Sequence, residues 1–117
     1  TRFIGNTVIF NEKFNETYVG FENHSGRTHI GNLTPLGKCV HGYGNNGQSG
    51  YEGCVYKNTF CTYFHGSLLS KNPELADRLL KLALDKKYSE EIALTSLDDS
   101  FELKAKEIMI NRLNNKQ

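Results

Sequence analysis

The feature of this sequence that most constrains its fold is a change of pattern near Lys71. Before that residue, short β-branched and aromatic segments alternate with turns rich in glycine and asparagine, which is typical of a sheet built from short strands. After it, apolar residues recur at helical spacing among charged ones. The sequence therefore predicts an α/β chain in which short strands and hairpins are followed by two C-terminal helices.

The strand-rich part is expected to hold two hairpins and one further strand. The segments with strand-like alternation or composition are 7–10, 17–21, 39–43, 52–57 and 59–64. The polar segment 11–16 separates the first two strands, and Lys57-Asn58 separates the last two, so each pair is expected to form a hairpin. The glycine-rich loop after residue 43 contains Asn46-Gly47, a strong signal for a tight turn.

Two amphipathic helices are expected after the strands. The first has Asn72 at its N-cap and Pro73 at its first position, where both residue types are favoured. Its expected apolar face is Leu75, Ala76, Leu79, Leu80, Ala83 and Leu84. The second is expected to begin near Asp98 or Asp99 and to bury Phe101, Ala105, Ile108, Met109 and Leu113. The residues of this helix that are expected in water are Lys104, Lys106, Glu107 and Arg112.

Composition excludes several classes of function. Charged residues make up 23% and the net charge is +1, so no field of a single sign would attract nucleic acid or an anionic membrane. No apolar run approaches the ~20 residues of a membrane span, and no leader pattern precedes the first strand. Cys39, Cys54 and Cys61 cannot all pair with one another, so we expect free, buried thiols and a cytoplasmic protein.

His65 is the strongest candidate for chemistry. It ends a β-rich run and is followed by Gly66, which places an imidazole at a strand end where it can reach a substrate. Near neutral pH, imidazole can take a proton from a thiol and return it to a departing amine. From spacing alone, a structural histidine at the solvent edge remains the alternative.

Other polar residues are expected to have supporting roles. Glu22 and His24 are two residues apart, so both should face one side of a strand and form a hydrogen-bonded pair near the site. The loop 42–53 lacks a Gly-Lys-Ser/Thr ending, which favours a hairpin loop over a phosphate-binding loop. The histidines and cysteines lack the close paired spacing of a zinc site, so no metal is expected.

Several motifs occur in the order found in one enzyme family. They are residues 20–28 (GFENHSGRT), 42–46 (GYGNN), 52–58 (EGCVYKN) and 62–66 (TYFHG), the last followed by Asn72-Pro73. Together they resemble the cobyric acid synthase-like branch of class I glutamine amidotransferases. Within that branch they are most similar to the glutaminase subunits of lipid II isoglutaminyl synthases. The resemblance covers almost the whole chain.

The resemblance implies a fold and an activity. The fold is a flavodoxin-like α/β domain, of which residues 1–117 would form the C-terminal half. The activity is hydrolysis of L-glutamine to glutamate and ammonia, without a cofactor. The ammonia would pass to a Mur-ligase-like, ATP-dependent subunit that amidates the D-glutamate of lipid II. His65 matches the catalytic histidine of the family, and Arg2 matches its glutamine-binding arginine.

The chain departs from the family pattern at the nucleophile. No cysteine here has the flanking glycines of the strand-to-helix elbow, so this chain is expected to be inactive alone. Ser67 stands where many relatives carry a glutamate, so a carboxylate of the partner ligase is expected to orient His65. The alternatives are amidation of cobyrinic or cobyric acid, or a non-catalytic partner-binding module. Self-association through an exposed sheet edge is also expected.

Overall fold

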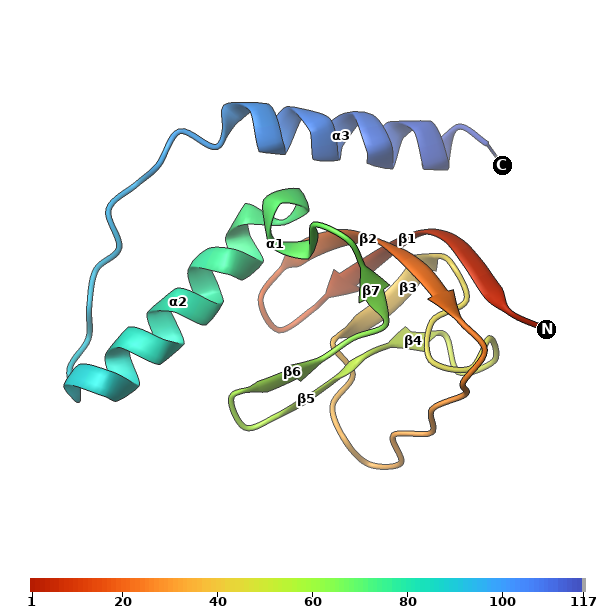
Figure 1. The fold of residues 1–117 in the computed structure, drawn as a ribbon, viewed down its shortest axis with the longest axis horizontal. Helices are drawn as coiled ribbons and strands as arrows, with labels where there is room; N and C mark the ends of the chain where they lie inside the picture. The colour runs from red at the N-terminus through yellow and green to blue at the C-terminus, as the bar shows by residue number, and fades with distance from the viewer. Residues whose placement is uncertain (117) are drawn as a thin grey trace.

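The computed structural model, which describes residues 1–116, contains a five-stranded sheet, a small separate hairpin and three helices (Figure 1). The strands are β1 (Phe3–Asn11), β2 (Glu16–His24), β3 (Gly37–His41), β4 (Tyr51–Glu52), β5 (Cys54–Tyr56), β6 (Thr59–Cys61) and β7 (Phe64–His65). The helices are α1 (Leu68–Lys71), α2 (Pro73–Tyr88) and α3 (Ser100–Asn114). The sheet order is β4-β3-β1-β2-β7, and every neighbouring pair is antiparallel.

The first predicted hairpin is confirmed and is longer than the sequence pattern indicated. β1 and β2 pair along their whole length, from Phe3 opposite His24 to Asn11 opposite Glu16. Asn11 closes the turn, because its side-chain oxygen accepts the N–H of Phe14 and its amide donates to the Leu36 carbonyl. The hairpin forms the centre of the sheet, since β3 pairs with β1 and β7 pairs with β2.

The second predicted hairpin is confirmed at β5 and β6, but each of its expected strands is broken in two. Gly53 separates β4 from β5, because it adopts a left-handed φ of 65° and a Cβ there would lie 2.3 Å from the Cys61 carbonyl oxygen. Thr62 and Tyr63 separate β6 from β7, because both are bound by the buried carboxylate of Glu52. These breaks place β4 and β7 at opposite edges of the main sheet.

Each face of the sheet is covered in part. On the α2 face, a cluster of buried side chains consists of Ile9, Tyr18, Leu36, Phe64 and Leu75. On the α3 face, Val8 and Val19 pack against Leu113, with Met109 and Ile110 beside them. Figure 1 shows α3 crossing above β1 and β2. The succession of apolar residues in β1 is thus explained by helices on both sides of it.

The first predicted helix is confirmed as α2, but Asn72 does not cap it with its side chain. The Asn72 side chain instead accepts the N–H of Val19 at 2.7 Å and donates to the Val19 carbonyl at 2.8 Å, which fastens the helix start to β2. Only the first turns of α2 reach the sheet, because the helix runs away from it (Figure 1). Leu75 is therefore buried, whereas Leu80 and Ala83 are exposed against expectation.

The second predicted helix is confirmed as α3, but the side that it buries was predicted wrongly. Phe101, Ala105 and Ile108 are exposed, and Lys106 is buried. The helix is rotated so that Met109 and Leu113 meet the valines of the sheet. This rotation points Lys106 inward, where its ammonium group pairs with Glu74 of α2. Lys104, Glu107 and Arg112 are in water as predicted.

Within residues 1–116, none of the helices has the length and the apolar content that a bilayer span needs.

Candidate functional site

The β2–β7 pairing places His65 on the α3 face of the sheet. His65 lies opposite Phe21, and Phe64 lies opposite Glu22. Successive residues of a strand point to opposite faces. Because Phe64 belongs to the cluster on the α2 face, the imidazole of His65 must point to the other side, and it is exposed there.

Gly66 allows the chain to turn directly after the histidine. Its φ of 77° lies in the left-handed region that favours glycine, and α1 begins two residues later. The nearest atom to a Cβ at this position would be the Lys71 ammonium nitrogen, at 3.8 Å. The glycine is therefore required by backbone conformation rather than by lack of space.

Arg2 lies on the same face, at the same end of β2. Its guanidinium donates to the side-chain oxygen of Asn23 at 2.9 Å. Asn23 is two residues beyond Phe21, so it shares the face of His65 at a distance of about 7 Å along the strand. Ile4, which pairs with Asn23, is 54% exposed. The two predicted site residues therefore border one uncovered part of the sheet.

Glu22 and His24 point to one side of β2 as predicted, but this side is the α2 face, behind His65. The expected hydrogen bond between them is not formed, because His24 Nε2 lies 3.6 Å from Glu22 Oε2. Glu22 is fully buried and accepts the backbone N–H groups of Tyr43 and Gly44 instead. His24 donates from Nδ1 to the Gly26 carbonyl at 3.0 Å. Both residues thus hold neighbouring loops by hydrogen bonds on the α2 face of the sheet.

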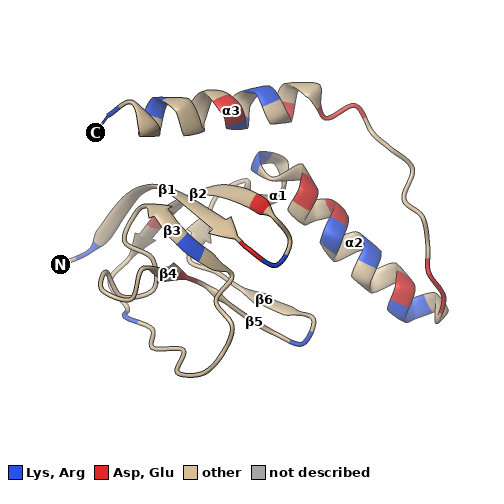
Figure 2. Ribbon diagram, turned by 180° about the vertical axis from the view of Figure 1, so that it is seen from behind, with Lys and Arg blue, Asp and Glu red and all other residues tan. Residues whose placement is uncertain are grey.

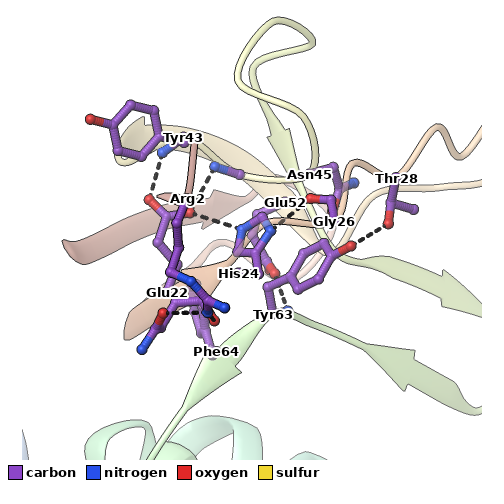
Figure 3. A network of polar contacts seen from close by, with 12 residues as sticks. Arg2, Glu22, His24, Gly26, Thr28, Tyr43, Asn45, Glu52, Tyr63 and Phe64 are labelled. Carbon is purple, nitrogen blue, oxygen red and sulfur yellow. Dashed lines mark hydrogen bonds and ion pairs between the residues drawn. The ribbon is translucent and has the colours of Figure 1, made fainter. Parts of the chain in front are cut away.

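An aromatic stack links the loop after β2 to the segment before β7. The rings of His24 and Tyr63 are parallel, with centroids 3.6 Å apart (Figure 3). The Tyr63 hydroxyl shares a hydrogen bond of 2.7 Å with Thr28 Oγ1. Phe3 meets the edge of the His24 ring at 5.5 Å. These contacts tie Tyr63, two residues before His65, to the first hairpin.

Sequence reasoning missed Glu52 as a site residue. It is fully buried, and its Oε1 accepts the Tyr63 N–H at 2.6 Å and the Thr62 hydroxyl at 2.9 Å. Burial raises the pKa of this carboxyl to about 7, and the negative charge of Glu22 adds to the rise, although the two hydrogen bonds oppose it. The sequence signal for Glu52 is an acidic residue next to a glycine inside a strand-like segment. That signal does not indicate which residues Glu52 binds.

The three cysteines lie in strands as predicted, but they are less buried than expected. Cys39 and Cys54 are half-buried, and Cys61 is exposed opposite Cys54. Burial raises the pKa of Cys39 to about 12, and it also raises the pKa of Cys54. Reactive cysteines have lowered pKa values because the thiolate is the nucleophile. Neither of these two thiols is therefore prepared for attack at neutral pH.

Arg2 and His65 are both exposed at the surface. A cavity of about 1050 Å³ lies elsewhere, between the turn of the first hairpin and the loop 28–38, and neither Arg2 nor His65 lines it. No group of three acidic, histidine or cysteine side chains within residues 1–116 could hold a metal ion. The arrangement offers one exposed imidazole and one guanidinium on a common surface, whereas the three cysteines lie on β3, β5 and β6.

Comparisons with known proteins relate this chain to glutamine amidotransferases. The CobB/CobQ-like glutamine amidotransferase domain matches residues 1–73. "Lipid II isoglutaminyl synthase (glutamine-hydrolyzing) subunit GatD" of Streptococcus pneumoniae is 52% identical over 99 residues, which are 84% of this chain and 38% of that protein. The Staphylococcus aureus subunit of the same name is 42% identical over 113 residues, which are 97% of this chain and 45% of that protein.

A shorter stretch of the chain is similar to an enzyme named for a different product. A "Probable cobyric acid synthase" of Methanothermobacter thermautotrophicus is 42% identical over 65 residues, which are 56% of this chain and 13% of that protein. The chain thus spans less than half the length of each of these curated relatives.

Proposed function

The chain belongs to the CobB/CobQ-like glutamine amidotransferase family, and from that premise we propose that residues 1–117 are the C-terminal part of one flavodoxin-like class I glutaminase domain. The share of the relatives that the chain covers, 38% and 45%, supports this proposal. So does the uncovered face that carries Arg2 and His65, because an amino-terminal part could complete it. The nucleophilic cysteine would lie in that part.

We further propose that the complete protein hydrolyses L-glutamine and supplies ammonia for amidation of the D-glutamate of lipid II. The names of the two GatD relatives support this pathway, as does their similarity over 84% and 97% of the chain. The cobyric acid synthase similarity extends over only 56% of it. The partner in this proposal is a Mur-ligase-like, ATP-dependent subunit, and the setting is the cytoplasm.

The exposed imidazole of His65 on the uncovered face is the observation that carries the proposal. In the complete enzyme, a cysteine thiolate attacks the side-chain amide of glutamine and forms a glutamyl thioester, which water then hydrolyses. His65 takes the proton of the thiol and returns it to the departing ammonia. Arg2 binds the α-carboxylate of glutamine, because a guanidinium has five donors and only one of its nitrogens is engaged with Asn23.

The test uses the full-length protein together with its ligase subunit and measures glutamate release. We expect His65→Ala to lower kcat by about 10²- to 10⁴-fold, as loss of a general base does. Arg2→Ala should mainly raise KM for glutamine, because it weakens binding of the substrate carboxylate.

His29→Ala is the matched control, because His29 is also an exposed histidine but does not lie on β7. It should leave the rate unchanged. The 117-residue chain alone should release no glutamate. A His65→Ala enzyme as active as the His29→Ala enzyme would remove the basis of the proposal.

A further inference from the structure

The strand that carries His65 has few restraints of its own. β7 has two residues, lies at an edge of the sheet, and pairs only with Phe21 and Glu22 of β2. After the strand ends at His65, the chain turns immediately at Gly66. The place of the imidazole therefore depends on how Thr62 and Tyr63, the residues that enter the strand, are held.

A chain of hydrogen bonds holds these residues from inside the protein. Glu52 Oε1 accepts the N–H of Tyr63 at 2.6 Å and the hydroxyl of Thr62 at 2.9 Å. Thr62 Oγ1 in turn accepts the N–H of Phe64 at 3.0 Å. Figure 3 shows Glu52, Tyr63 and Phe64 within this network. The last bond reaches the residue next to His65.

The carboxylate at the start of this chain is itself fixed. Glu52 is fully buried and pairs with Gly37 of β3 at the opposite edge of the sheet. The next residue, Gly53, donates its N–H to the side chain of Asn45 and accepts the Asn45 amide at its carbonyl. Asn45 is also buried. A buried, hydrogen-bonded part of the fold is thus connected to the short edge strand through the side chains of Glu52 and Thr62.

We propose that Glu52 and Thr62 are positioning residues for His65, and this inference rests on the glutaminase function proposed above. They fix the point at which the main chain enters β7 and so set the place of the imidazole relative to the nucleophile. A displacement of about 1 Å at a catalytic group can cost about 10²-fold in rate. Both hydrogen bonds to Glu52 use Oε1, so an uncharged side chain that keeps this oxygen can also keep them.

A purely structural role makes a different prediction. If these bonds only stabilise the connection between β6 and β7, their loss lowers the melting temperature and leaves kcat of the folded enzyme unchanged. If they position His65, kcat falls while KM for glutamine stays constant, because Arg2 and Asn23 are untouched.

The decisive experiment compares Thr62→Val with Thr62→Ser in the full-length enzyme with its ligase subunit. Valine has nearly the shape of threonine but lacks the hydroxyl, whereas serine keeps it. We expect Thr62→Val to lower kcat for glutamate release by about 10-fold or more, with KM changed less than about 2-fold. Thr62→Ser should stay within about 3-fold of the parent enzyme. Thr59→Val, in β6 of the same hairpin and exposed, is the control and should change neither value.

A second pair of variants tests Glu52. Glu52→Gln keeps Oε1 and should retain kcat within about 3-fold, whereas Glu52→Leu removes the acceptor and should lose at least as much as Thr62→Val. If Glu52→Leu does not fold, the threonine pair decides the matter, because Thr62 is only half-buried. Equal kcat values for Thr62→Val and Thr62→Ser would overturn the positioning role, whether both are high or both are low. A fully active His65→Ala enzyme would instead remove the proposed function itself.

Discussion

The strand-rich part and the helical part of this chain bury charge in opposite ways. In the sheet, Glu22 and Glu52 are fully buried: Glu22 accepts the backbone N–H groups of Tyr43 and Gly44, and Glu52 accepts the backbone N–H of Tyr63 together with the Thr62 hydroxyl. In the helices, Lys106 is buried and pairs with another side chain, Glu74. Figure 2 shows the remaining charges spread along α2 and α3, with few on the strands. The buried carboxylates of the sheet are thus held mainly by hydrogen bonds from the main chain, whereas the buried ammonium group is held by an opposite charge.

Apolar residues show the same contrast. The sheet places Ile9, Tyr18 and Leu36 in a closed cluster. In contrast, α3 leaves Phe101 86% exposed and Ile108 56% exposed, although both lie on what the sequence pattern marks as its apolar side. Helical periodicity therefore identifies a face that suits burial. The periodicity does not determine which face of the helix meets the sheet of the same chain.

The largest change in unfolding free energy is expected when an isoleucine of the sheet is truncated and compared with one of α3. Ile9→Ala should lower the free energy of unfolding by about 2–5 kcal/mol, because it opens a cavity in a closed cluster. Ile108→Ala is the matched change on α3 and should cost less than about 1 kcal/mol. Urea denaturation of the 117-residue chain, followed by circular dichroism, measures both values. Equal losses would show that the outer face of α3 is covered in solution.

A smaller effect is expected from the pH dependence that Glu52 confers. In the folded state the Glu52 carboxyl has a pKa of about 7, whereas the ordinary pKa of a glutamate is 4.5. Between these pH values the folded chain binds the extra proton, so its stability falls as the pH rises. At about 1.4 kcal/mol for each pH unit, the loss amounts to about 3 kcal/mol.

Glu52→Gln should remove this contribution, because an amide does not titrate. The difference in unfolding free energy between the variant and the parent chain should therefore change in favour of the variant from pH 4.5 to pH 7. Denaturation curves at several pH values test this expectation. A difference that stays constant over this range would show that the folded carboxyl titrates like an exposed one.

The smallest effect is expected at Phe101. Phe101→Ser should change the unfolding free energy by no more than about 0.5 kcal/mol, because the ring is in water and both residues have similar helix propensities. Thermal denaturation is sufficient to measure it. A loss above about 1 kcal/mol would show that the ring packs against a partner in solution.

The parts of the fold that follow from local pattern were predictable. The first hairpin was recognised from its alternation, and the start of α2 from Asn72-Pro73. The division of the later strands was not, because it depends on a left-handed Gly53 and on the reach of one carboxylate. These features act between residues about ten positions apart, where alternation carries no information.

The candidate site was predictable to a similar degree. His65 was proposed from its position before a glycine and from family resemblance, and Arg2 from the resemblance alone. That both border one face follows only from the register of β2 with its neighbours, in which Phe21 lies opposite His65 and Asn23 opposite Ile4. Register is set by tertiary pairing, so neither this common face nor the role proposed for Glu52 could be read from spacing.

The segment between α2 and α3 has a consequence for how such a chain can change in length. After Asp85 and Lys81 bind the backbone of Ile92, residues 93–99 have no regular structure before α3 begins. Doubling the length of a flexible connection costs only about 0.6 kcal/mol in closure entropy. Insertions or fused modules at this point should therefore be tolerated with α3 still seated on Val8 and Val19, whereas the same insertions between β6 and β7 would displace the histidine.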